Sequence, residues 1–225
     1  DLPGASLNAC VDDGALLDLG ISSHQIDEPS RGFSYRFDGR LDMRMDESQP
    51  LSAYEVVNDY DERELERILF TYGEERFARK IVANIVKERA QAPIETTQQL
   101  VEIIRRSTPA FYQRQGHPAK KTFQAIRIEV NGELEGLREG IESIAERIKS
   151  GGRFAIITFH SLEDRIVKQT FRLMCTDCIC DKSLPVCVCG HKATAKAAGK
   201  FKPDENELKT NPRSASATLR VIEKL

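Results

Sequence analysis

Two short apolar runs that end in glycine or polar residues mark buried strands in this chain. The first covers residues 15–19, and Gly20 with two serines follows it. The second covers residues 154–159 after a Ser-Gly-Gly turn, and His160 follows it. A short apolar run bounded by turn residues is typical of a buried strand in a parallel sheet. Because ligands bind beyond the carboxyl ends of such strands, the residues that follow both runs are candidate site residues.

Apolar residues at helical spacing predict a group of helices in the middle of the chain. The predicted helices, with Ser52 and Thr97 as N-caps of the first and last, cover residues 53–58, 62–70, 74–89 and 98–106. No strand pattern interrupts this block. We therefore predict a small all-α domain at residues 52–116, inserted between two parts of an α/β domain at residues 1–51 and 117–225.

The last part of the chain alternates between helix and strand patterns. An amphipathic helix runs to Ile148, and a second helix covers residues 163–174, with Ser161 and Asp164 placed like a capping box. Residues 192–203 have the composition of a linker, and residues 218–223 that of a final strand. This order predicts βα crossovers in a mostly parallel sheet.

Composition and charge narrow the possible partners. The chain has 225 residues, of which 40% are hydrophobic and 30% charged, as in soluble globular proteins. Because no apolar run reaches the length of a membrane span, we expect a cytoplasmic protein that does not contact membranes. Residues 70–127 contain eleven Lys and Arg against five Asp and Glu. This local excess indicates a polyanionic partner, unless it is only the solvated surface of the helices.

Residues 27–46 have neither helical nor strand periodicity, which predicts a long and ordered loop. Three aromatic residues alternate with four arginines in this loop: Phe33, Tyr35 and Phe37, with Arg31, Arg36, Arg40 and Arg44. Unstacked RNA bases stack on aromatic rings and on guanidinium planes. The pattern therefore indicates RNA contact, or else a loop that is packed by its own aromatic side chains.

Five of the six cysteines lie close together, in the spacing C-x2-C-x-C-x6-C-x-C. In a reducing compartment such a cluster favours a metal over disulfides. We predict a zinc site formed by Cys175, Cys178, Cys187 and Cys189, with a set of free thiols as the alternative.

Several motifs in order along the chain resemble those of the MraW/RsmH family, the bacterial 16S rRNA cytosine-N4 methyltransferases. They are residues 18–25, 31–34, 41–46, 72–76, 122–127, 159–165 and 211–214. The resemblance implies a class I (Rossmann-like) methyltransferase sheet with an inserted helical domain that recognises RNA. It also implies S-adenosylmethionine as methyl donor, and N4-methylation of a cytidine in the decoding centre of 16S rRNA, with the small ribosomal subunit as partner.

In this family an acid and a glutamine of the first motif contact the cofactor, which carries over to Asp18 and Gln25. The family's Gly-Gly-x-Gly-His cofactor loop and its ribose-binding acid lie earlier in the family's chain, and neither is present in this sequence. We therefore expect an N-terminally incomplete sheet. Two alternatives follow: a non-catalytic RNA- or ribosome-binding remnant of the enzyme, and a zinc-stabilised regulatory binding module.

Methyl transfer from a sulfonium is an in-line displacement, so positioning and desolvation are the main catalytic tasks. An acceptor that holds the cytosine amine would orient its lone pair for attack. Candidate catalytic residues for this work are Ser22, Ser23, Asp42, Arg44 and His160. The alternatives are turn and capping roles for the two serines, and a structural role for the histidine.

Overall fold

The computed structural model describes residues 13–181, 184 and 186–225. These residues form two compact units. The first, which we call the sheet unit, comprises the described residues up to Gly20 together with Leu134–Leu225, and the second, the helical unit, comprises Ile21–Glu133.

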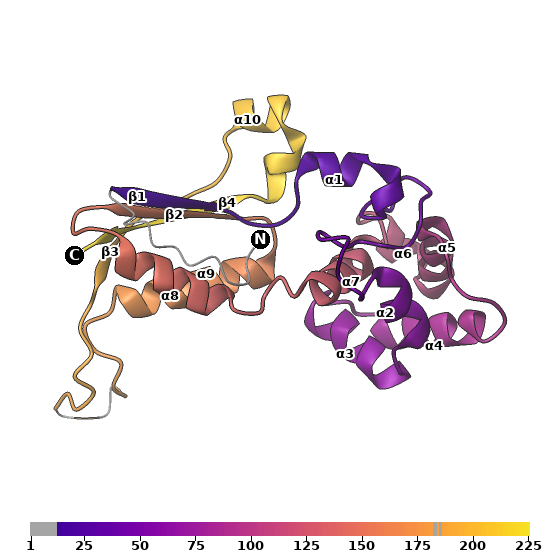
Figure 1. Ribbon diagram of the computed structural model, residues 1–225, viewed down its shortest axis with the longest axis horizontal. Coiled ribbons are helices and arrows are strands. Elements are labelled where there is room, and N and C mark those ends of the chain that lie inside the picture. Colours follow the sequence, from indigo (N-terminus) through magenta and orange to yellow (C-terminus); the bar gives the residue numbers. More distant parts are fainter. Residues whose placement is uncertain (1–12, 182–183, 185) are drawn as a thin grey trace. The chain divides into compact units, whose positions relative to one another are not determined.

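The sheet unit contains a four-stranded sheet in the order β1-β2-β4-β3 (Figure 1). Its strands are β1 (Gly14–Asp18), β2 (Arg153–Thr158), β3 (Ala195–Phe201) and β4 (Thr218–Lys224). The pairs β2–β4 and β3–β4 are antiparallel, and β1–β2 is parallel. The predicted strands are confirmed to within one residue at each end. A mostly parallel sheet is wrong for the described strands, because β4 runs against both of its neighbours.

Two helices cover one face of this sheet, α8 (Leu137–Arg147) and α9 (Ser161–Met174) (Figure 1). Their buried side chains form one core with those of the sheet, including Ile141, Phe154, Ile156, Val167 and Phe171. The C-terminal part of the unit also contains α10 (Glu205–Thr210) and a 3-10 turn, η2 (Pro212–Ser216).

The amphipathic pattern that runs to Ile148 forms two helices rather than one. The first, α7 (Lys120–Asn131), ends at Gly132, and α8 follows Gly136; both glycines are left-handed, with φ of 58° and 67°. The predicted linker at residues 192–203 contains β3, so that prediction is also wrong.

The helical unit contains α2 (Ala53–Asp59), α3 (Glu62–Thr71), α4 (Ala78–Arg89), α5 (Thr97–Ser107), α6 (Ala110–Gln113) and α7. The four predicted helices are confirmed, and so is the Ser52 cap, which forms a reciprocal capping box with Glu55. Two ends differ from the prediction. Glu74 has a positive φ of 48° and α4 begins only at Ala78, and Thr96, rather than Thr97, caps α5.

The core of the helical unit reaches beyond the predicted limits of 52 and 116. Leu41 and Met43 of the preceding loop are fully buried in it, and so is Ile126 of α7. The loop and α7 therefore pack with the helices, and the division into domains at residues 52 and 116 stays a prediction. None of the helices in the described residues is long and apolar enough to cross a membrane.

Candidate active site

The carboxyl ends of β1 and β2 meet at one edge of the sheet unit. Asp18 is the last residue of β1 and pairs with Ile157, and the amide of Leu19 donates to the carbonyl of Ile157 at 3.1 Å. The Asp18 side chain is exposed. The chain turns at once at Gly20, whose φ of 91° favours glycine and where a Cβ would lie 3.6 Å from the Phe159 ring. Asp18 and the residues after β2 thus lie at the same edge, as the sequence predicts.

His160 follows β2 at this edge and caps α9. Its Nδ1 lies 3.5 Å from the amide nitrogen of Glu163, a long hydrogen bond. The Glu163 carboxylate accepts in return from the amides of Phe159 at 3.0 Å and His160 at 3.4 Å. The predicted capping box of Ser161 and Asp164 is therefore wrong, because the cap lies one residue earlier and uses an imidazole in place of a hydroxyl.

The His160 and Glu163 side chains are only 7% and 2% exposed. His160 Nε2 lies 3.1 Å from Glu163 Oε1, but this contact lacks hydrogen-bond alignment, so it is one of proximity. Both ring nitrogens thus face the first turn of the helix that His160 begins. This geometry supports the structural alternative for the histidine, since the imidazole fixes the turn after β2.

Asp164 joins the start of α9 to β4. Its carboxylate accepts two hydrogen bonds from Arg220, at 2.7 Å from Nε and 2.9 Å from Nη2. These bonds hold the pKa of the Asp164 carboxyl below its usual value, although partial burial acts in the opposite direction. The sequence pattern predicts Asp164 at a helix terminus but does not indicate Arg220, 56 residues later, as its partner.

This pair predicts an acid-sensitive contribution to stability. Because the folded-state pKa of Asp164 is lowered, the contribution is present above the unfolded pKa of about 4 and is lost as the pH falls through the folded-state value. We expect Asp164→Asn to lower the free energy of unfolding by about 1 kcal/mol at pH 7 and to have a smaller effect at about pH 3. Amide hydrogen exchange in β4 at both pH values measures this difference. Glu142→Gln removes a more exposed ion pair to Arg138 and is the control, in which β4 exchange should not change.

The serines after Asp18 begin a five-residue helix, α1 (Ser23–Asp27). Ser22 caps it: the Gln25 amide donates to Ser22 Oγ at 3.3 Å, and the Ser22 amide donates to Gln25 Oε1 at 3.0 Å. The side chain of Ser23 is exposed. The capping alternative therefore holds for Ser22, while the hydroxyl of Ser23 faces solvent.

The loop of residues 27–46 begins with a 3-10 turn, η1 (Pro29–Arg31), and Arg44 organises its second half. The Arg44 guanidinium donates to both oxygens of Asp42, at 2.9 and 2.8 Å, and to the carbonyls of Glu47 and Gln49, each at 2.8 Å. Burial raises the pKa of Asp42, but the hydrogen bonds from Arg44 outweigh it and hold that pKa below its usual value. The two predicted residues are thus brought together, and each is the other's main partner.

An asparagine that sequence reasoning missed fixes the same part of the loop. Asn131 donates to the carbonyl of Met43 at 2.8 Å and accepts from the amide of Met45 at 2.7 Å. Met43 is fully buried and has a left-handed φ of 61°, an uncommon conformation for a residue with a side chain. The one sign of this role in the sequence is that Asn131 is a polar residue at the end of an apolar helix face.

The loop's aromatic residues divide into two groups. Phe33 is buried, and Tyr35 stacks on the His117 ring at a centroid distance of 4.3 Å. Burial lowers the pKa of His117, and the nearby charges of Arg105 and Arg36 lower it further. Phe37 is 46% exposed. The alternative of a loop packed by its own aromatic side chains therefore holds for Phe33 and Tyr35, and Phe37 remains available to a partner.

Comparison with known proteins decides the family. Residues 5–225 match the model of the MraW methylase family. The chain belongs to this family. The chain is 55% identical over 215 residues to a protein of Clostridium botulinum (strain Kyoto / Type A2), covering 95% of this chain and 70% of that protein. A protein of Symbiobacterium thermophilum is 54% identical over 216 residues, covering 95% and 68%.

Both relatives bear the name ribosomal RNA small subunit methyltransferase H. The predicted MraW/RsmH resemblance is confirmed, and S-adenosylmethionine as methyl donor follows from membership of a methylase family. The edge of the sheet beyond β1 and β2 and the loop after α1 are the parts of this methylase that sequence reasoning selected as its site.

Four cysteines among the described residues form one cluster in the sheet unit. The sulfur atoms of Cys178, Cys180, Cys187 and Cys189 all lie within 4.8 Å of one another, an arrangement that could hold a metal ion. Three of these residues were predicted, but Cys180 takes the place of Cys175. Cys175 lies at the end of α9, partly buried against the core of the sheet unit.

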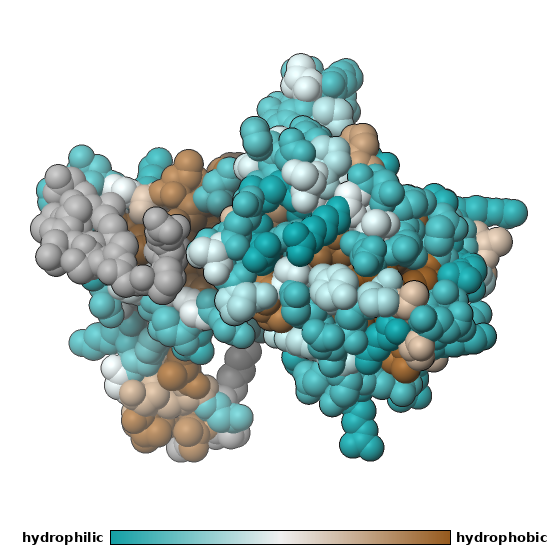
Figure 2. Space-filling view, turned by 45° about the vertical axis from the view of Figure 1, so that its right-hand side comes forward, coloured by the Kyte–Doolittle hydropathy of each residue, from teal (hydrophilic) through white to brown (hydrophobic). Residues whose placement is uncertain are grey.

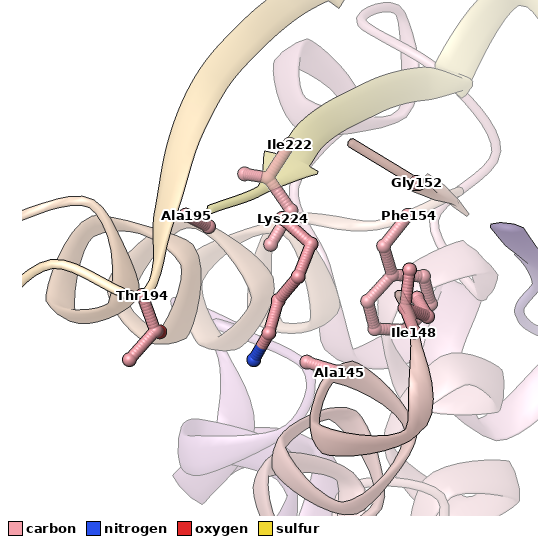
Figure 3. Close-up of a pocket in the computed structure, with 8 residues that line it drawn as sticks. All are labelled: Ala145, Ile148, Gly152, Phe154, Thr194, Ala195, Ile222 and Lys224. Carbon is pink, nitrogen blue, oxygen red and sulfur yellow. The ribbon is translucent and has the colours of Figure 1, made fainter. Parts of the chain in front are cut away.

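A shallow pocket lies elsewhere in the sheet unit, between α8, β3 and β4 (Figure 3). It is lined mainly by apolar side chains such as Ile148, Phe154 and Ile222, with Lys224 at its side. None of the predicted site residues lines it. Its lining belongs to the packing of helix on sheet and offers no group for methyl transfer.

Proposed function

We propose that this chain catalyses N4-methylation of a cytidine in the decoding centre of 16S rRNA, with S-adenosylmethionine as methyl donor. The observation that carries this proposal is the identity of 55% with a relative named ribosomal RNA small subunit methyltransferase H, which covers 95% of this chain. All of the described residues that we assign to the site lie within the region matched by the family model. The small ribosomal subunit and its 16S rRNA are the proposed partners.

The cofactor is proposed to contact Asp18 and Gln25. The exposed Asp18 carboxylate at the carboxyl end of a parallel strand fits a ligand that donates hydrogen bonds. The Gln25 carbonyl oxygen is occupied by the Ser22 amide, which leaves its amide nitrogen as the group that can donate to a ligand. When bound, S-adenosylmethionine supplies an electrophilic methyl group.

The remaining site residues are proposed to position the substrate base. The exposed Ser23 hydroxyl can accept from the cytosine amine, whereas Ser22 is engaged as a cap. Asp42 and Arg44 hold the loop in shape through their bidentate pair, and His160 fixes the turn after β2. On this proposal Asp42, Arg44 and His160 are positioning residues. Asp42 and Arg44 bind each other, and the buried His160 side chain begins α9 through its Nδ1.

Binding of rRNA is proposed to involve the start of α4. Arg76, Arg79 and Lys80 are exposed. Arg79 has 93% of its side chain accessible and makes a long ion pair with Glu66 at 3.9 Å. Positive charge near a helix N-terminus opposes the helix dipole, so these cations do not serve the stability of α4. A phosphate backbone is the partner that such a cluster suits.

Transfer of a labelled methyl group from S-adenosylmethionine to small ribosomal subunits tests the proposal. We expect label on one cytidine, located by mass spectrometry of nuclease fragments, and at least a tenfold lower rate for Asp18→Asn, a loss of about 1.4 kcal/mol. Glu146→Gln, an exposed acid of α8, is the matched control and should leave the rate unchanged.

The assay compares the 225-residue chain with a longer version, because this chain covers 70% of the length of the Clostridium relative. Binding of subunits without transfer by either version would favour the non-catalytic remnant instead. Label on an adenine or on a ribose would contradict the cytidine assignment.

A further inference from the structure

We propose that Cys178, Cys180, Cys187 and Cys189 form a closed, structural zinc site between α9 and β3. The spacing of their sulfur atoms carries this inference. Four of the sulfur–sulfur distances are 3.4 Å for Cys178–Cys187, 3.9 Å for Cys180–Cys187, 3.6 Å for Cys187–Cys189 and 3.8 Å for Cys178–Cys189. A tetrahedral site with Zn–S bonds of about 2.3 Å has sulfur atoms about 3.8 Å apart. These four distances are close to that value, and all four sulfurs lie within 4.8 Å of one another, so the set needs little adjustment to surround a zinc ion.

Other reasons for this clustering do not fit. A disulfide requires sulfurs about 2.05 Å apart, well below the shortest separation of 3.4 Å. Cysteine without a ligand is usually a buried, hydrophobic residue, yet Cys178, Cys187 and Cys189 are exposed. Four sulfurs that converge on one point of an exposed segment gain no hydrophobic burial by doing so, whereas a shared cation would hold them together.

Backbone amides are directed at two of the sulfurs. The amide of Val188 donates to Cys180 Sγ at 3.3 Å, and that of His191 to Cys189 Sγ at 3.4 Å. Gly190 has a left-handed φ of 64°, and this turn brings the His191 amide back toward Cys189. Hydrogen bonds of this kind offset the negative charge of thiolates and orient them around a metal.

The chain between α9 and β3 is held together where it leaves α9 and enters β3 by contacts that need no metal. The Thr194 amide donates to the carbonyl of Met174 at 2.8 Å, and His191 Nε2 lies 2.9 Å from the carbonyl of Leu173. These contacts hold the end of α9 beside the start of β3. Zinc would hold together the part of this segment that lies farther from the sheet, where the four cysteines are.

The described apolar residues between α9 and β3 bury little of their surface. Ile179, Val186 and Val188 are 54%, 70% and 78% exposed. Figure 2 shows apolar side chains gathered on the part of the molecule that projects downward, which matches the segment between α9 and β3 in Figure 1. Small units without a sufficient core are commonly stabilised by a metal. Because four protein ligands fill the coordination sphere, the site is structural and has no open position for chemistry.

Metal analysis of the full 225-residue chain, purified under reducing conditions without chelators, tests this site. We expect about one zinc per chain. Cys180→Ser and Cys187→Ser should lose this zinc, and Cys175→Ser, which lies outside the tetrahedron, should keep it. If Cys175→Ser lost zinc and Cys180→Ser kept it, this assignment would be overturned. The ligands would then be the four predicted from the sequence: Cys175, Cys178, Cys187 and Cys189.

A second measurement needs no variant. Zinc is removed from the wild-type chain and replaced by Co²⁺, whose visible spectrum distinguishes tetrahedral sulfur coordination from other environments. We expect intense tetrahedral bands and one equivalent of cobalt, displaced by one equivalent of zinc. A chain that binds neither ion while all its thiols remain titratable would show that the cluster is only a set of free thiols.

Discussion

Reversal of Arg76, Arg79 and Lys80 to glutamate should weaken the binding of small-subunit rRNA by about 100-fold at low salt. Each of these side chains is exposed and can reach a phosphate. Arg76 lies just before α4, and Arg79 and Lys80 lie in its first turn. Other arginines of the helical unit are already engaged in the protein. Arg89, for example, donates to the carbonyls of Val57 and Tyr60 at 2.7 and 2.6 Å. The three chosen cations are therefore the ones whose loss should affect RNA and not the fold.

The salt dependence of RNA binding shows whether the three side chains contact phosphates. If three phosphate contacts are lost, the slope of log affinity against log salt should become shallower by about two to three. The measurement is a filter-binding or fluorescence titration against small-subunit rRNA at several salt concentrations. A fall in affinity with an unchanged slope would mean that the variant acts through the shape of the helical unit.

A matched variant controls for total charge. Arg138, Lys168 and Arg172 are exposed on α8 and α9 of the sheet unit, and their reversal to glutamate changes the net charge by the same amount. We expect this variant to bind RNA with nearly the affinity of the wild type. Equal loss in both variants would show that only overall charge matters, and the helical unit would then have no special part in RNA recognition.

The helices of the middle block could be predicted from sequence because their signals are local. Their apolar residues recur at helical spacing, and caps such as Ser52 with Glu55 satisfy the first amides within a single turn. The strands 15–19 and 154–159 could be predicted for the same reason, because a buried strand is a continuous apolar run. Family motifs add the methyltransferase type of the α/β fold and the activity, which no periodicity indicates.

Features that depend on a distant partner could not be predicted in this way. The segment Ala195–Phe201 consists mostly of alanine, glycine and lysine, which favour no strand, yet it pairs with β4 because that strand offers an open edge. The choice between Cys175 and Cys180 depends on where α9 ends and the chain turns. His160 is outside the residue types that usually cap helices, so its role could be seen only with Glu163 in place.

The residues of the candidate site could be predicted from the sequence, but their partners could not. Sequence reasoning placed Asp18 and His160 after strands, and their common edge is confirmed by the parallel pairing of β1 with β2. It also selected Asp42 and Arg44, but could not show that the two bind each other and so leave few polar atoms for a substrate. Residue type indicates which chemistry a side chain can perform, and only its partners decide whether it is available.

Substitution of Gly39 by alanine should destabilise the helical unit by about 3 kcal/mol. A Cβ at this position would lie 1.9 Å from the carbonyl oxygen of Pro29. Both sides of this clash are backbone. Gly39 also donates to Thr97 Oγ1 at 3.1 Å and accepts from the Thr97 amide at 2.9 Å, so the loop cannot move away without releasing the start of α5.

Tyrosine fluorescence isolates this effect. The chain has no tryptophan, and its five tyrosines, Tyr35, Tyr54, Tyr60, Tyr72 and Tyr112, all belong to the helical unit. Urea unfolding followed through tyrosine should therefore show a lower midpoint for Gly39→Ala. Gly140→Ala is the control, because nothing lies within 4 Å of a Cβ there and Gly140 belongs to α8 of the sheet unit. The tyrosine transition of Gly140→Ala should match that of the wild type. An unchanged midpoint in Gly39→Ala would contradict the prediction, because it would mean that the loop is not packed as closely as its backbone distances require.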